Sequence, residues 1–233
     1  MELMQLVRTL MLLDDLLPPL IIKDKRFQYP IIQGGMGIGI SLAPLAGAVS
    51  REGGLGVVSS AHLDRLVSKR EGVNLNIFKS VFLEMTLAKL LSEEKPVAIN
   101  IMVAIQKHYD DSVRAAIKAG ASAIISGGGM PLHLPEIEDP GDTALIPIVS
   151  SRKAMELIWK KWDRSKVRKY RPDAVVIEGD CAGGHLGFKF DQIGLKENKL
   201  ENLLPPIKDF AMKHGDFPVI VAGGIYDRSD ILR

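Results

Sequence analysis

One short segment of the chain combines a carboxylate, an imidazole and four glycines, groups that can move protons and admit a ligand. The segment VVIEGDCAGGHLGF, residues 175–188, runs from apolar residues into Glu178, and His185 follows seven positions later. An imidazole, with an ordinary pKa of about 6.5, can accept a proton near neutral pH. Glycines directly after a strand let backbone N–H groups approach a ligand closely. The segment therefore predicts a ligand-binding loop that contains one titratable histidine.

The elements that must position this loop alternate between strands and helices. The predicted strands are apolar without alternation, which is typical of strands buried on both faces of a parallel sheet. They cover residues 29–33, 55–60, 96–103, 121–129, 144–151, 173–179 and 217–225. Helices are predicted over 41–54, over a long region ending near Glu94, and over 110–120, 152–162 and 200–215, several of them ending in glycine.

Two parallel architectures compete for this pattern, the doubly wound sheet and the barrel. A dinucleotide-binding sheet opens with G-x-G-x-x-G, but QGGMGIG after the first strand lacks that spacing, and a P-loop motif is absent from the sequence. Glycines and polar residues instead follow every strand, as expected at the carboxyl-terminal face of a TIM-type barrel. They are Gly34 to Gly37, Ser59-Ser60, Asn100, Ser126 to Gly129, Ser150-Ser151, residues 178–187, and Gly223-Gly224.

The sequence thus predicts an α/β fold, a TIM (β/α)8-type barrel that is truncated after the seventh strand. Residues 1–28 are expected to form an N-terminal extension, with a short amphipathic helix over 6–22. Residues 29–233 are expected to form the barrel, incomplete at the C-terminus. The length of 233 residues suits one such domain.

Composition excludes several function classes. Thirty basic and 28 acidic residues give a net charge of +2, so we expect no nucleic-acid partner and no acidic membrane partner. Asp14, Asp15 and two prolines interrupt the apolar N-terminal segment, so no membrane span is expected. Cys181 is the single cysteine, which excludes an intrachain disulfide and a cysteine zinc cluster; we expect no metal and a reducing, cytoplasmic location.

Five motifs in order resemble a known family. PIIQGGMG, GGLGVV, VAINIM, EGDCAGGHLGF and PVIVAGGI together resemble the nitronate monooxygenases, formerly called 2-nitropropane dioxygenases, and the related flavin-dependent enoyl-acyl-carrier-protein reductases. The resemblance implies an FMN-binding barrel with His185 as the active-site histidine. It also implies cofactor-binding positions, which are Gly35, Met36, Gly37, Asn100, Ser126, Glu178, Gly183, Gly184, Gly223 and Gly224. The family's Gly-Thr turn after strand eight, which completes the flavin-phosphate site, has no counterpart in the sequence.

The resemblance implies oxidation of a nitronate or nitroalkane by O₂ to a carbonyl compound and nitrite. An alternative is an FMN- and NAD(P)H-dependent enoyl-acyl-carrier-protein reductase, for which the basic run at 152–171 would dock an acidic carrier. A further alternative is a barrel that binds another phosphorylated ligand without flavin, because fold alone does not give function. The resemblance leaves a homodimer open.

Overall fold

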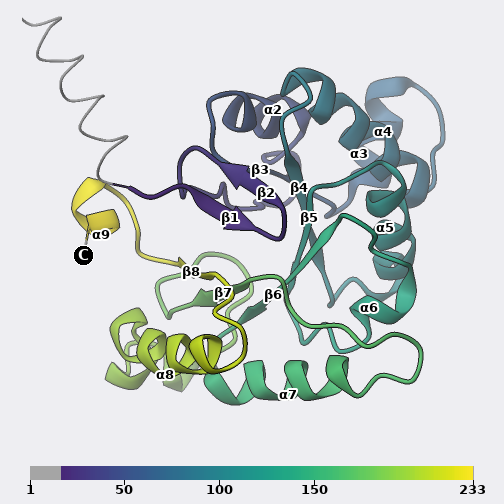
Figure 1. The fold of residues 1–233 in the computed structure, drawn as a ribbon. Helices are drawn as coiled ribbons and strands as arrows, with labels where there is room; N and C mark the ends of the chain where they lie inside the picture. Colours follow the sequence, from purple (N-terminus) through teal and green to yellow (C-terminus); the bar gives the residue numbers. More distant parts are fainter. Residues whose placement is uncertain (1–16, 233) are drawn as a thin grey trace, which may run out of the picture.

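The computed structural model describes residues 17–232 and forms an incomplete barrel (Figure 1). Six parallel strands pair in chain order, so each strand lies beside the next one along the sequence. They are β3 (Gly56–Ser59), β4 (Val97–Met102), β5 (Ala123–Gly127), β6 (Ala144–Val149), β7 (Val175–Glu178) and β8 (Val219–Ala222). The predicted α/β fold and partial TIM barrel are confirmed. Because the strands are parallel, their carboxyl ends meet at one mouth.

Helices cover the outer side of the sheet (Figure 1). They are α2 (Ala43–Arg51), α3 (Leu63–Glu71), α4 (Ile77–Leu91), α5 (Gln106–Lys118), α6 (Leu134–Ile137), α7 (Arg152–Asp163) and α8 (Leu200–Lys213). The short helix α9 (Arg228–Leu232) lies apart from the sheet (Figure 1), and short 3-10 helices occur at Phe190–Gln192 and Lys196–Asn198. Among residues 17–232, no helix is long and apolar enough to cross a membrane.

Two apolar clusters hold the sheet, one on each face. The outer cluster joins strand residues such as Ile99 and Ile124 to the helices. The inner cluster contains Val57, Ala98 and Val176, which fill the barrel interior. Both faces are therefore largely buried from β3 to β7, and this explains why these strands lack alternating polar residues. The residues of β8 are half-buried.

A small hairpin contributes to the inner cluster. Strands β1 (Leu20–Ile22) and β2 (Lys25–Phe27) pair antiparallel, and both Ile22 and Phe27 are buried among inner-cluster residues. The helix predicted over 6–22 is therefore wrong at its end, because residues 20–22 form a strand. Two prolines precede that strand, and proline ends a helix. The rest of that predicted helix, residues 6–16, lies outside the described residues.

Two further predictions need correction. The first predicted strand, 29–33, is reduced to a bridge between Ile32 and Leu55. The long helical region ending near Glu94 is two helices, α3 and α4. Gly72 ends α3 in a left-handed conformation with φ of 70°, and the Asn76 side chain caps α4 by accepting from the Lys79 N–H at 3.0 Å.

Candidate active site at the mouth of the barrel

The glycine loop after residue 33 packs directly against the end of β4. A Cβ built on Gly35 would lie 2.9 Å from the Asn100 Cγ and closer still to its Cβ. Only a residue without a side chain allows this approach. The structure therefore brings Gly35 and Asn100, two predicted site residues, into contact. Gly37 lies near Ala61, and Met36 is exposed beside them.

Strand alternation places two polar side chains toward the interior. Asn100 comes two residues after Ala98 in β4, and Glu178 comes two residues after Val176 in β7. Residues two apart on a strand face the same side, and Ala98 and Val176 both belong to the inner cluster. Both polar residues are half-buried at carboxyl ends of strands, and within residues 17–232 their side chains make no hydrogen bond. Burial raises the pKa of the Glu178 carboxyl above its ordinary value. The mouth thus offers an amide and a carboxyl group to a polar ligand.

The loop between β7 and α8 is held at two points on the mouth. A Cβ built on Gly187 would lie 2.8 Å from the Ser150 Cβ, at the end of β6. On the other side, a Cβ on Gly223, directly after β8, would lie 2.6 Å from the Ala182 nitrogen. The chain between Ala182 and Gly187 therefore spans from β8 to β6 across the end of β7.

His185 lies within that span. It is exposed, and its imidazole makes no hydrogen bond among the described residues. Gly183 and Gly184 precede it, and a Cβ on either would meet no atom within 4 Å. The open surface around these glycines leaves space for a ligand beside the imidazole.

A second pair of glycines follows β8. Gly223 and Gly224 both adopt positive φ, at 95° and 74°, and no hydrogen bond of either N–H group occurs among residues 17–232. A Cβ on Gly224 would lie 3.2 Å from the Cβ of Cys181, whose thiol is exposed. Successive free N–H groups in such a turn form a concavity that suits an anion.

Ser126 is the predicted site residue whose side chain does not join the others. Its hydroxyl donates to the Ile101 carbonyl oxygen at 3.0 Å and lies 2.7 Å from the hydroxyl of Tyr109 on α5. Ser126 comes two residues after Ile124 of the outer cluster, so the two side chains face the same side of β5. The side chain therefore faces the helices, and it links β5 to α5 rather than lining the interior.

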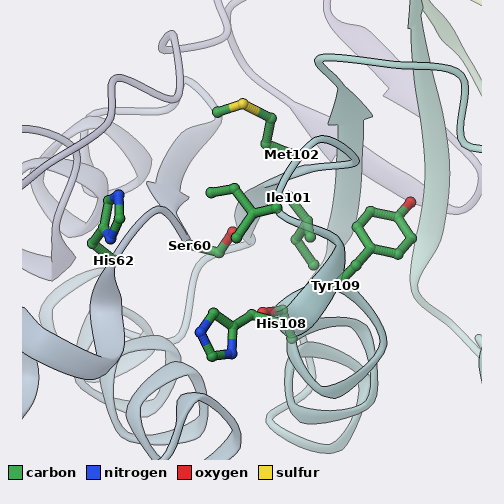
Figure 2. A pocket seen from close by; sticks show the side chains of 8 residues that line it. Ser60, His62, Ile101, Met102, His108 and Tyr109 are labelled. Atoms are coloured by element: carbon green, nitrogen blue, oxygen red, sulfur yellow. The ribbon is translucent and has the colours of Figure 1, made fainter.

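A separate recess lies between α3 and α5 (Figure 2). Its lining includes Ser60, His62 and His108, while the Tyr109 hydroxyl points away from the two histidines. The volume of about 10 Å³ leaves room for about one water molecule. This recess lies on the helix side of the sheet. Within the part of the chain that the structure describes, no group of three or more His, Cys, Asp or Glu side chains could hold a metal ion.

Sequence analysis missed two residues that organise the mouth. Gln33 and Ser41 sit at either end of the glycine loop and hydrogen-bond to each other at 2.8 Å. Ser41 precedes the helix-starting segment LAP, which is the usual place for a capping serine. In the structure its hydroxyl instead binds back to the loop at Gly34.

Comparison with known proteins identifies similar sequences. The family model described as nitronate monooxygenase matches residues 19–232. A protein of Bacillus subtilis (strain 168) named "Probable nitronate monooxygenase" is 28% identical over 222 residues, covering 87% of this chain and 60% of that protein.

Solved structures share the fold. FabK from Thermotoga maritima superposes with a TM-score of 0.66 at 24% identity, covering 88% of this chain and 54% of that one. A nitroalkane oxidase from Streptomyces ansochromogenes gives a TM-score of 0.63 at 19% identity, covering 85% and 59%. The chain spans little more than half the length of these similar proteins.

Proposed function

The chain belongs to the nitronate monooxygenase family, and on that premise we propose that the protein binds FMN and oxidises nitronates or nitroalkanes with O₂ to a carbonyl compound and nitrite. The observation that carries this proposal is the arrangement of the mouth. Bare backbone at Gly35 contacts Asn100, and the loop carrying His185 is held across the neighbouring strand ends.

The residues at the mouth fit a flavin with a phosphate tail. Asn100 and Glu178 are half-buried and offer hydrogen-bonding groups toward the interior, where a heterocycle needs polar partners. Gly183 and Gly184 leave backbone uncovered. The free N–H groups of Gly223 and Gly224 suit the phosphate.

FMN, when bound, would supply the redox chemistry of the reaction. His185 acts as the general base that accepts the substrate proton. A nitroalkane is acidic at the carbon that bears the nitro group, and an imidazole nitrogen of His185 accepts that proton while the electron pair of the C–H bond remains with the substrate as a nitronate. A substrate supplied as the nitronate has already lost this proton. His185 then only orients the anion.

The decisive experiment supplies propyl-2-nitronate to the full-length protein under air, without NAD(P)H. We expect a yellow protein and release of nitrite. Reduction of a crotonyl thioester that consumes NAD(P)H, with no nitrite formed, would establish the enoyl reductase instead. A colourless protein that binds phosphate ligands would exclude both flavin functions.

Replacement of His185 separates proton transfer from binding. We expect His185→Asn to retain FMN and to lower turnover of neutral nitroalkane by about 10²-fold or more, the usual contribution of a general base. Turnover of the nitronate should change much less. His62→Asn is a matched control, because His62 is also exposed after a strand end and its φ of 58° suits asparagine. Equal loss on both substrates would remove His185 from the role of base.

A further inference from the structure

The hydroxyl of Ser41 is the centre of the hydrogen bonds that shape the glycine loop. It donates to the Gly34 carbonyl oxygen at 2.9 Å, and it accepts from the Met36 N–H at 3.0 Å and from the Gln33 amide at 2.8 Å. One donor and two lone pairs are the full capacity of a hydroxyl group. Ser41 is completely buried, so water cannot replace any of these bonds.

Gln33 connects the same cluster to the sheet. Its side-chain nitrogen donates to the Val57 carbonyl oxygen at 3.1 Å, and its side-chain oxygen accepts from the Val57 N–H at 3.3 Å. The amide thus replaces a strand partner at the edge of β3. The Ser59 N–H also donates to the backbone oxygen of Ser41 at 2.8 Å. Both ends of the loop are fixed to β3 through these contacts.

The loop needs such fixing because its conformation is strained. Ile38 has a φ of 48°, a region that β-branched residues rarely adopt, and its side chain is 69% exposed. Contacts of the Ile38 side chain therefore do little to hold the loop. The fixed ends hold it, and they keep Gly35 pressed against Asn100.

We propose that Ser41 is a positioning residue for the flavin, with Gln33 as its partner. Ser41 acts through the backbone of Gly34 and Met36, and so it sets the place of Gly35 and of the Asn100 side chain before the cofactor binds. This inference rests on the proposed FMN site. It assigns a role to a buried serine that is not itself expected to touch FMN.

The test compares two buried serines in the full-length protein. Ser50 is 1% exposed, donates to the Pro96 carbonyl oxygen at 2.7 Å and accepts from the Gly56 N–H at 2.9 Å, at the opposite end of β3. Ser41→Ala and Ser50→Ala each remove one buried hydroxyl that both donates and accepts hydrogen bonds. We expect both variants to lower the melting temperature. Only Ser41→Ala should weaken FMN binding, by about tenfold or more, measured by flavin fluorescence titration.

A second readout needs no cofactor. Amide hydrogen exchange at Met36 should accelerate in Ser41→Ala and stay unchanged in Ser50→Ala. If Ser41→Ala does not fold, Gln33→Met, which removes the amide at similar volume, should show the same loss of FMN affinity. Wild-type protein that binds no FMN would refute the proposed function. Wild-type protein that binds FMN, with Ser41→Ala or Gln33→Met binding it equally well, would refute the positioning role alone.

Discussion

The contact between Gly35 and Asn100 gives the sharpest test of the mouth. In Gly35→Ala the new Cβ would lie 2.9 Å from the Asn100 Cγ and closer to its Cβ. The Cγ can rotate about the Cα–Cβ bond, but the Cβ is fixed by the backbone of β4. Either the loop or β4 must shift. Overpacking of this kind costs roughly 1–3 kcal/mol. For a protein of this size that corresponds to a fall in melting temperature of about 2–12 °C.

The neighbouring glycine supplies the control. A Cβ on Gly34 would meet no atom within 4 Å, and its φ lies outside the left-handed region. Gly34→Ala should leave stability unchanged or raise it by about 0.4–1 kcal/mol, because alanine restricts the unfolded chain. Thermal unfolding of both variants without cofactor measures the difference.

A double-mutant cycle then identifies the clash. Asn100→Gly removes the Cβ that Gly35→Ala would strike, so the cost of Gly35→Ala should be smaller in that background by roughly 1 kcal/mol or more, within the range of coupling between residues in contact. If Gly35→Ala is as stable as Gly34→Ala, or if the two substitutions add without coupling, the packing of this loop is not as described.

Three other outcomes are expected. Burial raises the folded-state pKa of Glu178, so the folded protein binds this proton more tightly than the unfolded protein. The free energy of unfolding should therefore fall as pH rises from the unfolded-state pKa near 4.5 through the raised folded-state pKa. Glu178→Gln lacks this titration, so urea unfolding should show it gaining stability relative to wild type as pH rises from about 4 to 8. Ser126→Ala should cost about 1–3 kcal/mol, because it deprives the half-buried Tyr109 hydroxyl of its partner, yet leave FMN affinity unchanged in titration. Gly183→Ala should leave the melting temperature of the cofactor-free protein unchanged and weaken FMN binding, since a Cβ there meets only open space; equal affinity would place the flavin elsewhere.

The order of the strands could be predicted from sequence because each is a short apolar run followed by glycine or polar residues. The helix ends near Gly53, Gly120 and Gly215 could also be predicted, because glycine readily adopts the left-handed conformation that ends a helix, and all three adopt positive φ. Local patterns of this kind depend only on neighbouring residues. They can therefore be read from the sequence without knowledge of tertiary contacts.

The orientation of Ser126 could not be predicted in this way. Every neighbour in AIISG is apolar or small, so the sequence does not tell which parity faces the helices. Only the bonds to Tyr109 and the Ile101 carbonyl resolve it. The reduced first strand is similar, since nothing in YPIIQ indicates that the Gln33 side chain, rather than backbone, pairs with Val57.

The glycines at the mouth fall into two groups that the sequence does not distinguish. Gly35, Gly187 and Gly223 have neighbours so close that the protein's own packing excludes a side chain. Their presence would be required with or without a ligand. Gly183 differs, because its φ lies outside the left-handed region and a Cβ would meet nothing within 4 Å. Internal packing does not account for a glycine there, nor at Gly34, which meets the same two conditions. At Gly183 the proposed FMN site would account for it, because a ligand could lie against the backbone beside His185.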